Sequence, residues 1–328
     1  MKTIEELTQY YETSLKPDLM VLDEERLRIK KKLVPLIIID AIVCIISLGL
    51  IAHFSVSIHW MILPLCFCAL LIFGWYLKFY RGFLDQFKEQ VIKKIVAFID
   101  PGLTYQKDQC VPKTLFTESL IFHERADRYE GDDLVSGRID KTDIQFSEIN
   151  VKRVEKTRQN TGTGSERKTK THTYPIFKGL FFVADFNKNF SKKTIVLPDK
   201  AEKLFGRLGQ KLQSMNTLHG ELIKLEDPDF EKQFAVYGDD QVESRYILST
   251  SLMKRISDFR KKTNKEIFLS FVASKLFVAI PYKGSLFEPS IVTSLVDFSK
   301  IREYFADLQI AINIVEDLNL NTRIWTKA

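Results

Sequence analysis

The sequence predicts an α+β fold in which a two-helix transmembrane hairpin is followed by a mixed α/β cytoplasmic domain with antiparallel strands. Residues 33–77 are almost continuously apolar, whereas nearly all of the 48 basic and 42 acidic residues of this 328-residue chain lie outside them. After residue 102, short stretches suited to strands alternate with stretches of helical period. The apolar run indicates membrane spans, and the mixture after it indicates an α+β domain.

Residues 1–32 are expected to form an N-terminal cytoplasmic helical segment. Thr3 and Glu6 have the spacing of a capping box, in which each side chain satisfies a backbone N–H of the other residue. A break is expected near Pro17, because proline cannot donate the hydrogen bond of a helix interior. The helix should then resume and lead into the apolar run.

Residues 33–54 and 58–77 are each long enough to cross a membrane, since about 20 helical residues reach roughly 30 Å. Asp40 is the one acid or base of the first segment before His53. An acid at a helix centre costs on the order of 3 kcal/mol on insertion scales. The segment also holds 14 Leu, Ile, Val and Phe residues, which contribute about 4 to 8 kcal/mol in favour of insertion. The sequence therefore predicts a transmembrane hairpin over residues 33–77.

Two interpretations of Asp40 stay open: an acid facing the second helix or the headgroups, and an intramembrane polar site for a proton or ion. Orientation follows from the flanks, because basic residues stay on the cytoplasmic side. The flanking basic residues are Arg26, Arg28, Lys30, Lys31, Lys32, Lys78 and Arg81. We expect a multi-pass protein of the inner (plasma) membrane with both termini cytoplasmic.

Residues 78–101 are expected to form a juxtamembrane helix that continues the second span. Its apolar residues recur at helical spacing until residues 100–102 stop the pattern; they are Phe83, Phe87, Val91, Ile95 and Phe98. Lys88, Lys93 and Lys94 should then lie near the headgroups. An amphipathic helix lying on the membrane surface is the alternative.

Residues 102–328 are expected to form the cytoplasmic α+β domain, with 102–218 and 219–328 as candidate subdomains. Strands are expected at residues 134–149, 176–185, 194–197, 222–225, 235–237, 246–248, 266–271 and 276–280. Helices are expected at residues 199–215, 249–262 and 297–318. The turn between the last two strands should lie at Ala273 and Ser274.

A basic loop is expected between two of these strands, at residues 152–175. It carries most of the net charge of +6, on Lys152, Arg153, Lys156, Arg158, Arg167, Lys168 and Lys170. Each such residue near an anionic leaflet contributes about 1 kcal/mol, so the loop is a candidate contact for anionic lipid headgroups. A solvated loop is the alternative. Nucleic acid is disfavoured, because no aromatic residue interleaves with the charges before Tyr174.

No catalytic, cofactor-binding or metal-binding motif is present in the sequence, so no cofactor is predicted. Three of the four cysteines (Cys44, Cys66, Cys68 and Cys110) lie in the apolar run, without zinc spacing. The pattern G-D-D-x-V-x-x-R occurs at residues 131–138 and 238–245. Each copy is expected to form a turn that enters a strand; paired carboxylates for a metal and a duplicated fold unit are the alternatives.

Four runs carry a resemblance to a known family: residues 131–143, 177–190, 225–248 and 317–327. Their sequences are GDDLVSGRIDKTD, FKGLFFVADFNKNF, LEDPDFEKQFAVYGDDQVESRYIL and DLNLNTRIWTK. In these runs the chain resembles the DUF3137 family of uncharacterised bacterial two-helix membrane proteins. The resemblance implies a membrane location and a bacterial origin, but no activity and no catalytic residues.

The anchor, the basic loop and the missing catalytic motifs favour a membrane-anchored cytoplasmic scaffold or binding module. Its expected partners are the lipid bilayer, anionic headgroups and an unidentified protein. One alternative is a membrane-tethered enzyme that uses the clustered aspartates Asp132, Asp133, Asp239 and Asp240. The other is an oligomeric transport component that uses Asp40.

Overall fold

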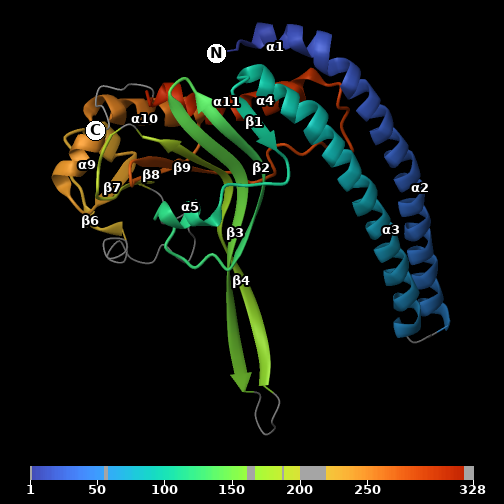
Figure 1. Ribbon diagram of the computed structural model, residues 1–328. Coiled ribbons are helices and arrows are strands. Elements are labelled where there is room, and N and C mark those ends of the chain that lie inside the picture. Colours follow the sequence, from blue (N-terminus) through green and yellow to red (C-terminus); the bar gives the residue numbers. More distant parts are fainter. Residues whose placement is uncertain (1, 55–57, 161–166, 187, 200–218, 321–328) are drawn as a thin grey trace. The chain divides into compact units, whose positions relative to one another are not determined.

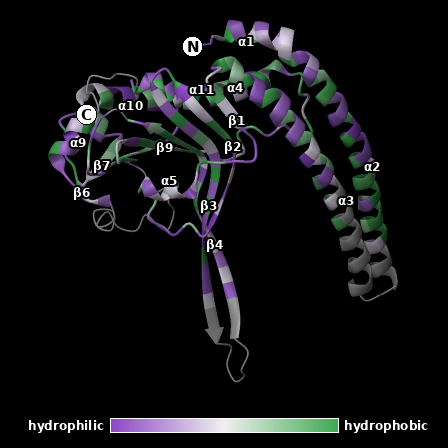
Figure 2. Cartoon of the chain, in the orientation of Figure 1, coloured by the Kyte–Doolittle hydropathy of each residue, from purple (hydrophilic) through white to green (hydrophobic). Residues whose placement is uncertain are grey.

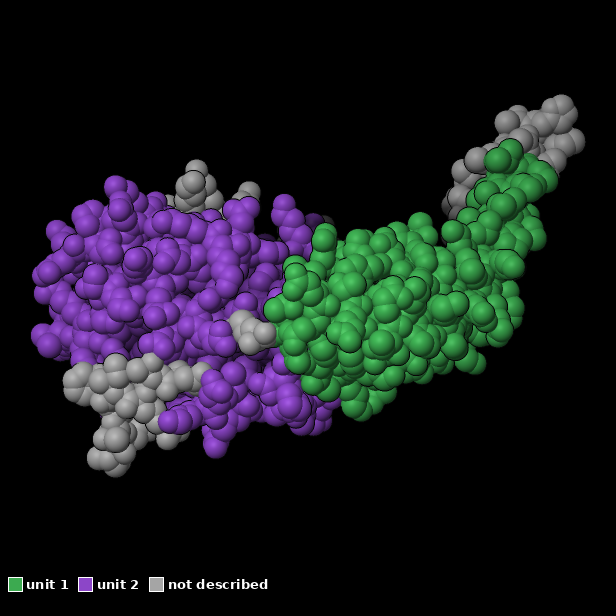
Figure 3. Space-filling model, turned by 90° about the horizontal axis from the view of Figure 1, so that it is seen from above, with its two compact units in different colours: residues 1–98, 287–305 green, residues 99–286, 306–328 purple. Residues whose placement is uncertain are grey.

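A computed structural model describes residues 2–54, 58–160, 167–186, 188–199 and 219–320 (Figure 1). Side chains are described for these residues except 48–54, 58–69, 71, 75, 158–160 and 167–169. The chain forms two compact units, residues 1–98 with 287–305 and residues 99–286 with 306–328 (Figure 3). The first unit is helical, and the second is built on one antiparallel sheet.

The helical unit begins with α1 (Ile4–Tyr10), the π-helical turn η1 (Tyr11–Leu15) and α2 (Lys16–Phe54). The predicted capping box is confirmed: the Thr3 hydroxyl accepts from the Glu6 N–H, and the Glu6 carboxylate accepts from the Thr3 N–H. The predicted break near Pro17 is wrong, because η1 passes directly into α2. The π turn just before the proline is the kind of local widening by which helices accommodate irregular positions.

The second helical run comprises α3 (Ile58–Phe87), the π turn η2 (Lys88–Ile92) and α4 (Lys93–Ile99). It continues and stops as the sequence predicts, and Phe83, Phe87 and Val91 on its predicted apolar face are fully buried. The expected position of Lys88 near the headgroups is wrong. Lys88 is 3% exposed, because it lies on the inward face of η2, three residues before the buried Val91.

The two helical runs are held together by aromatic contacts and by residues 287–305, which return to this unit. Tyr10 stacks on Phe98 with ring centroids 4.3 Å apart, which joins α1 to α4. The Tyr11 hydroxyl donates to the Val296 carbonyl at 2.6 Å. These contacts join the start of the first helical run to the end of the second and to residues 287–305.

The sheet unit contains, among the described residues, nine strands in the order β1-β2-β3-β4-β9-β8-β5-β7-β6, and every neighbouring pair is antiparallel. In that order the strands are Leu103–Gln106, Arg128–Ile139, Thr142–Asn160, Arg167–Asp185, Lys275–Pro281, Phe268–Val272, Thr194–Pro198, Phe234–Gly238 and Glu221–Leu222. The described helices of this unit are α5 (Lys113–Glu118), α8 (Pro228–Glu231), α9 (Gln241–Ile247), α10 (Thr250–Thr263) and the end of α11 (Phe298–Asp317). The predicted α+β class with antiparallel strands is therefore confirmed.

Several predicted elements of the sheet unit are confirmed in place. The Ser249 hydroxyl caps α10 by accepting from the Leu252 N–H. The β8–β9 hairpin turns at Ala273 and Ser274, both with positive φ. The helix predicted at 297–318 is α11. The helix predicted at 199–215 lies outside the described residues.

Other predicted elements are wrong. Residues 134–149 form parts of two strands, β2 and β3, because the chain reverses at Asp140, whose φ is +52°. Residues 246–248, predicted as a strand, lie at the end of helix α9. Asp240 starts that helix, since its carboxylate accepts from the Glu243 N–H at 2.7 Å.

The core of the sheet unit is rich in phenylalanine. Phe116 of α5 lies 5.2 Å from Phe122 and 5.4 Å from Phe181 of β4, measured between ring centroids. Phe181 in turn lies 6.3 Å from Phe277 of β9. Burying each such ring contributes about 1.5 to 3 kcal/mol, which explains why the parts of β4 and β9 that carry these rings are rich in apolar residues.

Candidate functional site

Between residues 34 and 46, α2 exposes large apolar side chains around most of its circumference, and only Asp40 and Cys44 are partly exposed. Ile37, Ile38 and Ile39 are 51%, 52% and 57% exposed, although successive residues of a helix point about 100° apart. The other exposed apolar residues of this segment are Val34, Leu36, Ile42, Val43, Ile45 and Ile46. Figure 2 shows this stretch of α2 as predominantly hydrophobic. A helix that is covered by water normally keeps a polar face, and this segment has none.

The predicted spans 33–54 and 58–77 fall within α2 and α3, which lie side by side in the helical unit (Figure 1). The predicted connection, residues 55–57, lies outside the described residues. Among the residues that the structure describes, no helix is both long enough and apolar enough to cross a membrane.

The basic residues that flank the apolar runs differ in their surroundings. Arg26 is 5% exposed and is bound to Asp23 at 2.8 Å and to the Ile291 carbonyl at 2.9 Å. It therefore holds the helical unit together and is not available to a headgroup. The exposed members of the flanking set are Arg28, Lys31, Lys32, Lys78 and Arg81. Asp40 is partly exposed.

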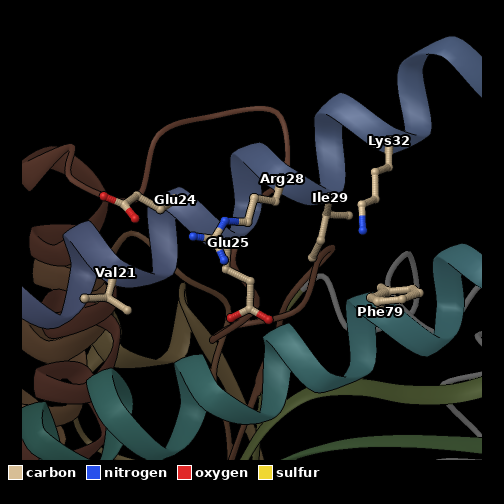
Figure 4. A pocket seen from close by; sticks show the side chains of 7 residues that line it. All are labelled: Val21, Glu24, Glu25, Arg28, Ile29, Lys32 and Phe79. Atoms are coloured by element: carbon tan, nitrogen blue, oxygen red, sulfur yellow. The ribbon is translucent and has the colours of Figure 1, made fainter.

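A hollow of about 250 Å³ lies between α2 and α3 next to these flanks. Its lining residues are Val21, Glu24, Glu25, Arg28, Ile29, Lys32 and Phe79, and we call it the α2–α3 hollow (Figure 4). Figure 4 shows Glu25, Ile29 and Lys32 projecting from α2 toward α3, which carries Phe79. The sequence did not predict this hollow, because the hollow forms only where α2 packs beside α3.

The predicted basic loop at 152–175 is wrong, because these residues belong to paired strands. β3 and β4 stay in register out to the pair Asn160 and Arg167. β2 pairs with β3 only as far as Lys152, and β9 pairs with β4 only as far as Gly179. Residues 153–160 and 167–174 therefore form a two-stranded extension, the β3–β4 ribbon, which projects from the sheet in Figure 1. Both its faces meet water, so the sequence lacks the apolar alternation that identifies a strand.

The predicted lipid-contacting residues occupy this ribbon and its base. Lys156 and Lys170 are exposed on the ribbon, and Lys152 is partly exposed at its base. Arg153 is engaged with Glu155 at 2.7 Å and lies over the Tyr174 ring. The side chains of Arg158, Arg167 and Lys168 lie outside the described residues.

The two G-D-D-x-V-x-x-R copies occupy different local structures. Asp133 lies at an irregularity of β2 with φ of +61°, is 1% exposed and accepts a hydrogen bond from the Tyr105 hydroxyl. In the second copy Asp240 caps α9. The prediction that each copy enters a strand is therefore wrong for the second, which enters a helix.

The aspartates do not form a described metal site. Asp132 lines a shallow hollow of about 290 Å³ with Glu130 and Glu148, and Glu148 accepts from the Leu286 N–H at 2.7 Å. Among the described residues, no group of three or more His, Cys, Asp or Glu residues could hold a metal ion.

A histidine pair, of which His219 is buried and His123 is exposed, joins two distant segments of the sheet unit and was missed by sequence reasoning. His123 Nε2 and His219 Nδ1 are 2.7 Å apart, so one nitrogen donates and the other accepts. His219 is 3% exposed. Its burial, together with the nearby His123 and Lys193, lowers the pKa of His219 to about 3, although the Leu120 backbone acts in the opposite direction. The pair is 96 residues apart in the chain, and no local pattern predicts it.

Residues 175–320 match the sequence model of DUF3137, a family described as a protein of unknown function. This match supports the resemblance to the DUF3137 family over these residues. No curated protein and no solved structure matches the chain. The DUF3137 match begins at the base of the ribbon in β4 and ends just after α11, so it leaves out the predicted spans and the first of the four resembling runs.

His219, inside the DUF3137 stretch, is expected to make stability depend on pH. Its pKa is about 3 when folded and 6.5 in its unperturbed form, so its contribution is complete above pH 6.5 and is lost as the pH falls. From pH 7.5 to 5.0 the loss should be about 2 kcal/mol. His219→Asn should remove this part of the pH dependence in urea titrations of the full chain followed by circular dichroism.

The matched control is His172→Asn, since His172 is exposed on the ribbon. It should keep the pH dependence of the wild type. If the wild type and His219→Asn lost equal amounts of folding free energy between pH 7.5 and 5.0, His219 would not be the source of this pH dependence.

Proposed function

We propose that this protein is a membrane-anchored cytoplasmic scaffold or binding module, held in the inner membrane by α2 and α3 as a hairpin with both termini cytoplasmic. One observation carries the proposal: the exposure of large aliphatic side chains around most of the circumference of α2 between residues 34 and 46. Each such side chain gains about 1.5 to 3 kcal/mol when it leaves water.

The distribution of these side chains favours lipid over a protein partner as their cover. A protein groove covers one face of a helix, whereas a bilayer covers all faces at once. The exposed cations also support the topology, because Arg28 and Lys31 precede the first apolar run and Lys78 follows the second. Basic residues are retained on the cytoplasmic side.

Ultracentrifugation of lysed cells tests the anchor. The full-length chain should sediment with membranes, resist extraction by alkaline carbonate and dissolve only in detergent. Trypsin should degrade residues 102–328 in inside-out vesicles and spare them in intact spheroplasts. Recovery of the chain in the supernatant without detergent would overturn the proposal.

The β3–β4 ribbon is proposed as a second contact, with anionic lipid headgroups. Lys156 and Lys170 support this, since both are exposed and their partners across the ribbon are Thr171 and Thr157, which carry no charge. Arg153 contributes less to this surface, because Glu155 already neutralises it.

Amine-reactive labelling of the full chain in vesicles checks the ribbon contact by mass spectrometry. Labelling of Lys156 and Lys170 should be about fivefold slower in vesicles containing phosphatidylglycerol than in phosphatidylcholine alone, since each contact contributes about 1 kcal/mol. The effect should disappear in high salt. The exposed Lys224, Lys254 and Lys261 serve as internal controls and should not change. Equal labelling of the ribbon in both lipids would exclude the contact.

A further inference from the structure

The α2–α3 hollow lies where the apolar runs meet the polar part of the helical unit. Lys32 immediately precedes residue 33, where the first apolar run starts. Phe79 follows the end of the second run at residue 77 by two positions. Glu25 lies seven residues before Lys32, which places its Cα about 10 Å further from the run. The hollow therefore begins at the edge of the apolar stretch and extends away from it.

The hollow carries two acids and two bases that are not satisfied by one another. Glu24 and Arg28 are four residues apart, the spacing at which opposite charges usually pair on a helix. Within the part of the chain that is described, neither of them makes a side-chain hydrogen bond or ion pair, and the same holds for Glu25 and Lys32. Their charges sum to zero, and Glu24, Arg28 and Lys32 are exposed, so their polar groups are accessible to a ligand.

We propose that the α2–α3 hollow binds the headgroup of a zwitterionic phospholipid with a primary ammonium, of the phosphatidylethanolamine type. Along α2, Arg28 and Lys32 lie nearer the apolar run than the two glutamates and take the phosphate. Glu25, whose side chain points toward α3, and its neighbour Glu24 lie further from the run and take the lipid ammonium. Ile29 and Phe79 offer an apolar wall to the glycerol end of the lipid.

The side chains present discriminate between headgroups. A primary ammonium donates charge-assisted hydrogen bonds to carboxylates, whereas the quaternary ammonium of choline has no N–H. Choline is bound by aromatic cages, and the hollow has a single ring, that of Phe79. An anionic headgroup such as that of phosphatidylglycerol would match Arg28 and Lys32 through its phosphate but has no ammonium to offset the charges of Glu24 and Glu25. Arg28 lies three residues from Glu25 and four from Glu24, about one turn of helix, which suits a headgroup whose two charges are about that close.

This site rests on the proposed membrane anchor for its supply of lipid, but its test does not require a bilayer. The purified full-length chain in detergent micelles is titrated with dihexanoyl phosphatidylethanolamine, dihexanoyl phosphatidylcholine and dihexanoyl phosphatidylglycerol, and binding is read by native mass spectrometry. The ethanolamine lipid should bind at least about tenfold more tightly than either of the others, as expected for charge-assisted hydrogen bonds made by that headgroup alone.

Variants assign the selectivity to the hollow. The double variant Glu24→Gln/Glu25→Gln should weaken binding of the ethanolamine lipid about tenfold and leave the choline lipid unchanged. Arg28→Gln should weaken both, since both carry a phosphate. The control Glu5→Gln/Lys31→Gln removes one acid and one exposed base of the same unit outside the hollow and should bind as the wild type does.

Two results would overturn the site: equal affinity of the wild type for ethanolamine and choline lipids, or unchanged affinity in a Glu24→Gln/Glu25→Gln variant that melts at the wild-type temperature. The substituted side chains are exposed or partly exposed, so folding should be retained. A chain that binds the ethanolamine lipid selectively yet stays in the supernatant would refute the membrane anchor alone. A sedimenting chain without selectivity would refute the headgroup site alone.

Discussion

The double substitution Ile38→Arg/Ile42→Arg is expected to release the chain from the membrane pellet. Insertion of the first apolar run is favoured by about 4 to 8 kcal/mol from its aliphatic and phenyl side chains and opposed by on the order of 3 kcal/mol from Asp40. The two arginines add at most about 5 to 7 kcal/mol of cost, the value for a helix centre, and remove about 1 kcal/mol of gain. The sum then opposes insertion, and fractionation followed by immunoblotting measures the shift.

The control for this prediction lies on the same helix. Met20 and Leu27 are 56% and 41% exposed, against 52% and 50% for Ile38 and Ile42, but they precede the apolar run. Met20→Arg/Leu27→Arg should sediment as the wild type does. If both double variants behave alike, the exposed apolar side chains of α2 do not contact lipid, and the anchor proposal fails.

The features predicted correctly from the sequence are those that depend on neighbouring residues. The capping box at Thr3 and Glu6, the Ser249 cap of α10 and the turn at Ala273 all follow from side chains within a few positions of the backbone groups they serve. Helix α9 could also have been predicted, because Asp240 and Glu243 have capping spacing. The preceding G-D-D pattern is typical of a turn before a strand, so a strand was predicted where helix α9 lies.

The features that were missed depend on residues far apart in the chain. The ribbon has the threonine-rich composition of a strand but no buried face, so periodicity could not reveal it. His219 becomes a buried partner of His123 only through the fold of the sheet unit. The α2–α3 hollow needs Phe79 from one helix and Arg28 from another. Candidate sites of this kind follow from packing, which sequence spacing alone does not specify.

Gly179→Ala is expected to unfold the sheet at its centre. Gly179 lies in β4 between β3 and β9, paired with Ile149 and Pro281, and its φ is +154°. A Cβ at this position would lie 2.2 Å from the carbonyl oxygen of Ile280, which is backbone and cannot move aside without breaking the β4–β9 pairing. Steric conflict and backbone strain together should cost at least about 3 kcal/mol.

Gly284→Ala provides the matched control, because no atom lies within 4 Å of the Cβ it would introduce. Its stability should stay within about 1 kcal/mol of the wild type. Hydrogen exchange of the full chain in detergent distinguishes the two variants. Amides of β4 and β9 should lose protection in Gly179→Ala and keep it in Gly284→Ala. Amides of α2 and α3 should stay protected in both variants, because their hydrogen bonds are internal to each helix. If the β4 and β9 amides stayed protected in Gly179→Ala, these strands would have to separate enough to admit a methyl group. That result would contradict the close approach of the Gly179 and Ile280 backbones, on which the prediction depends.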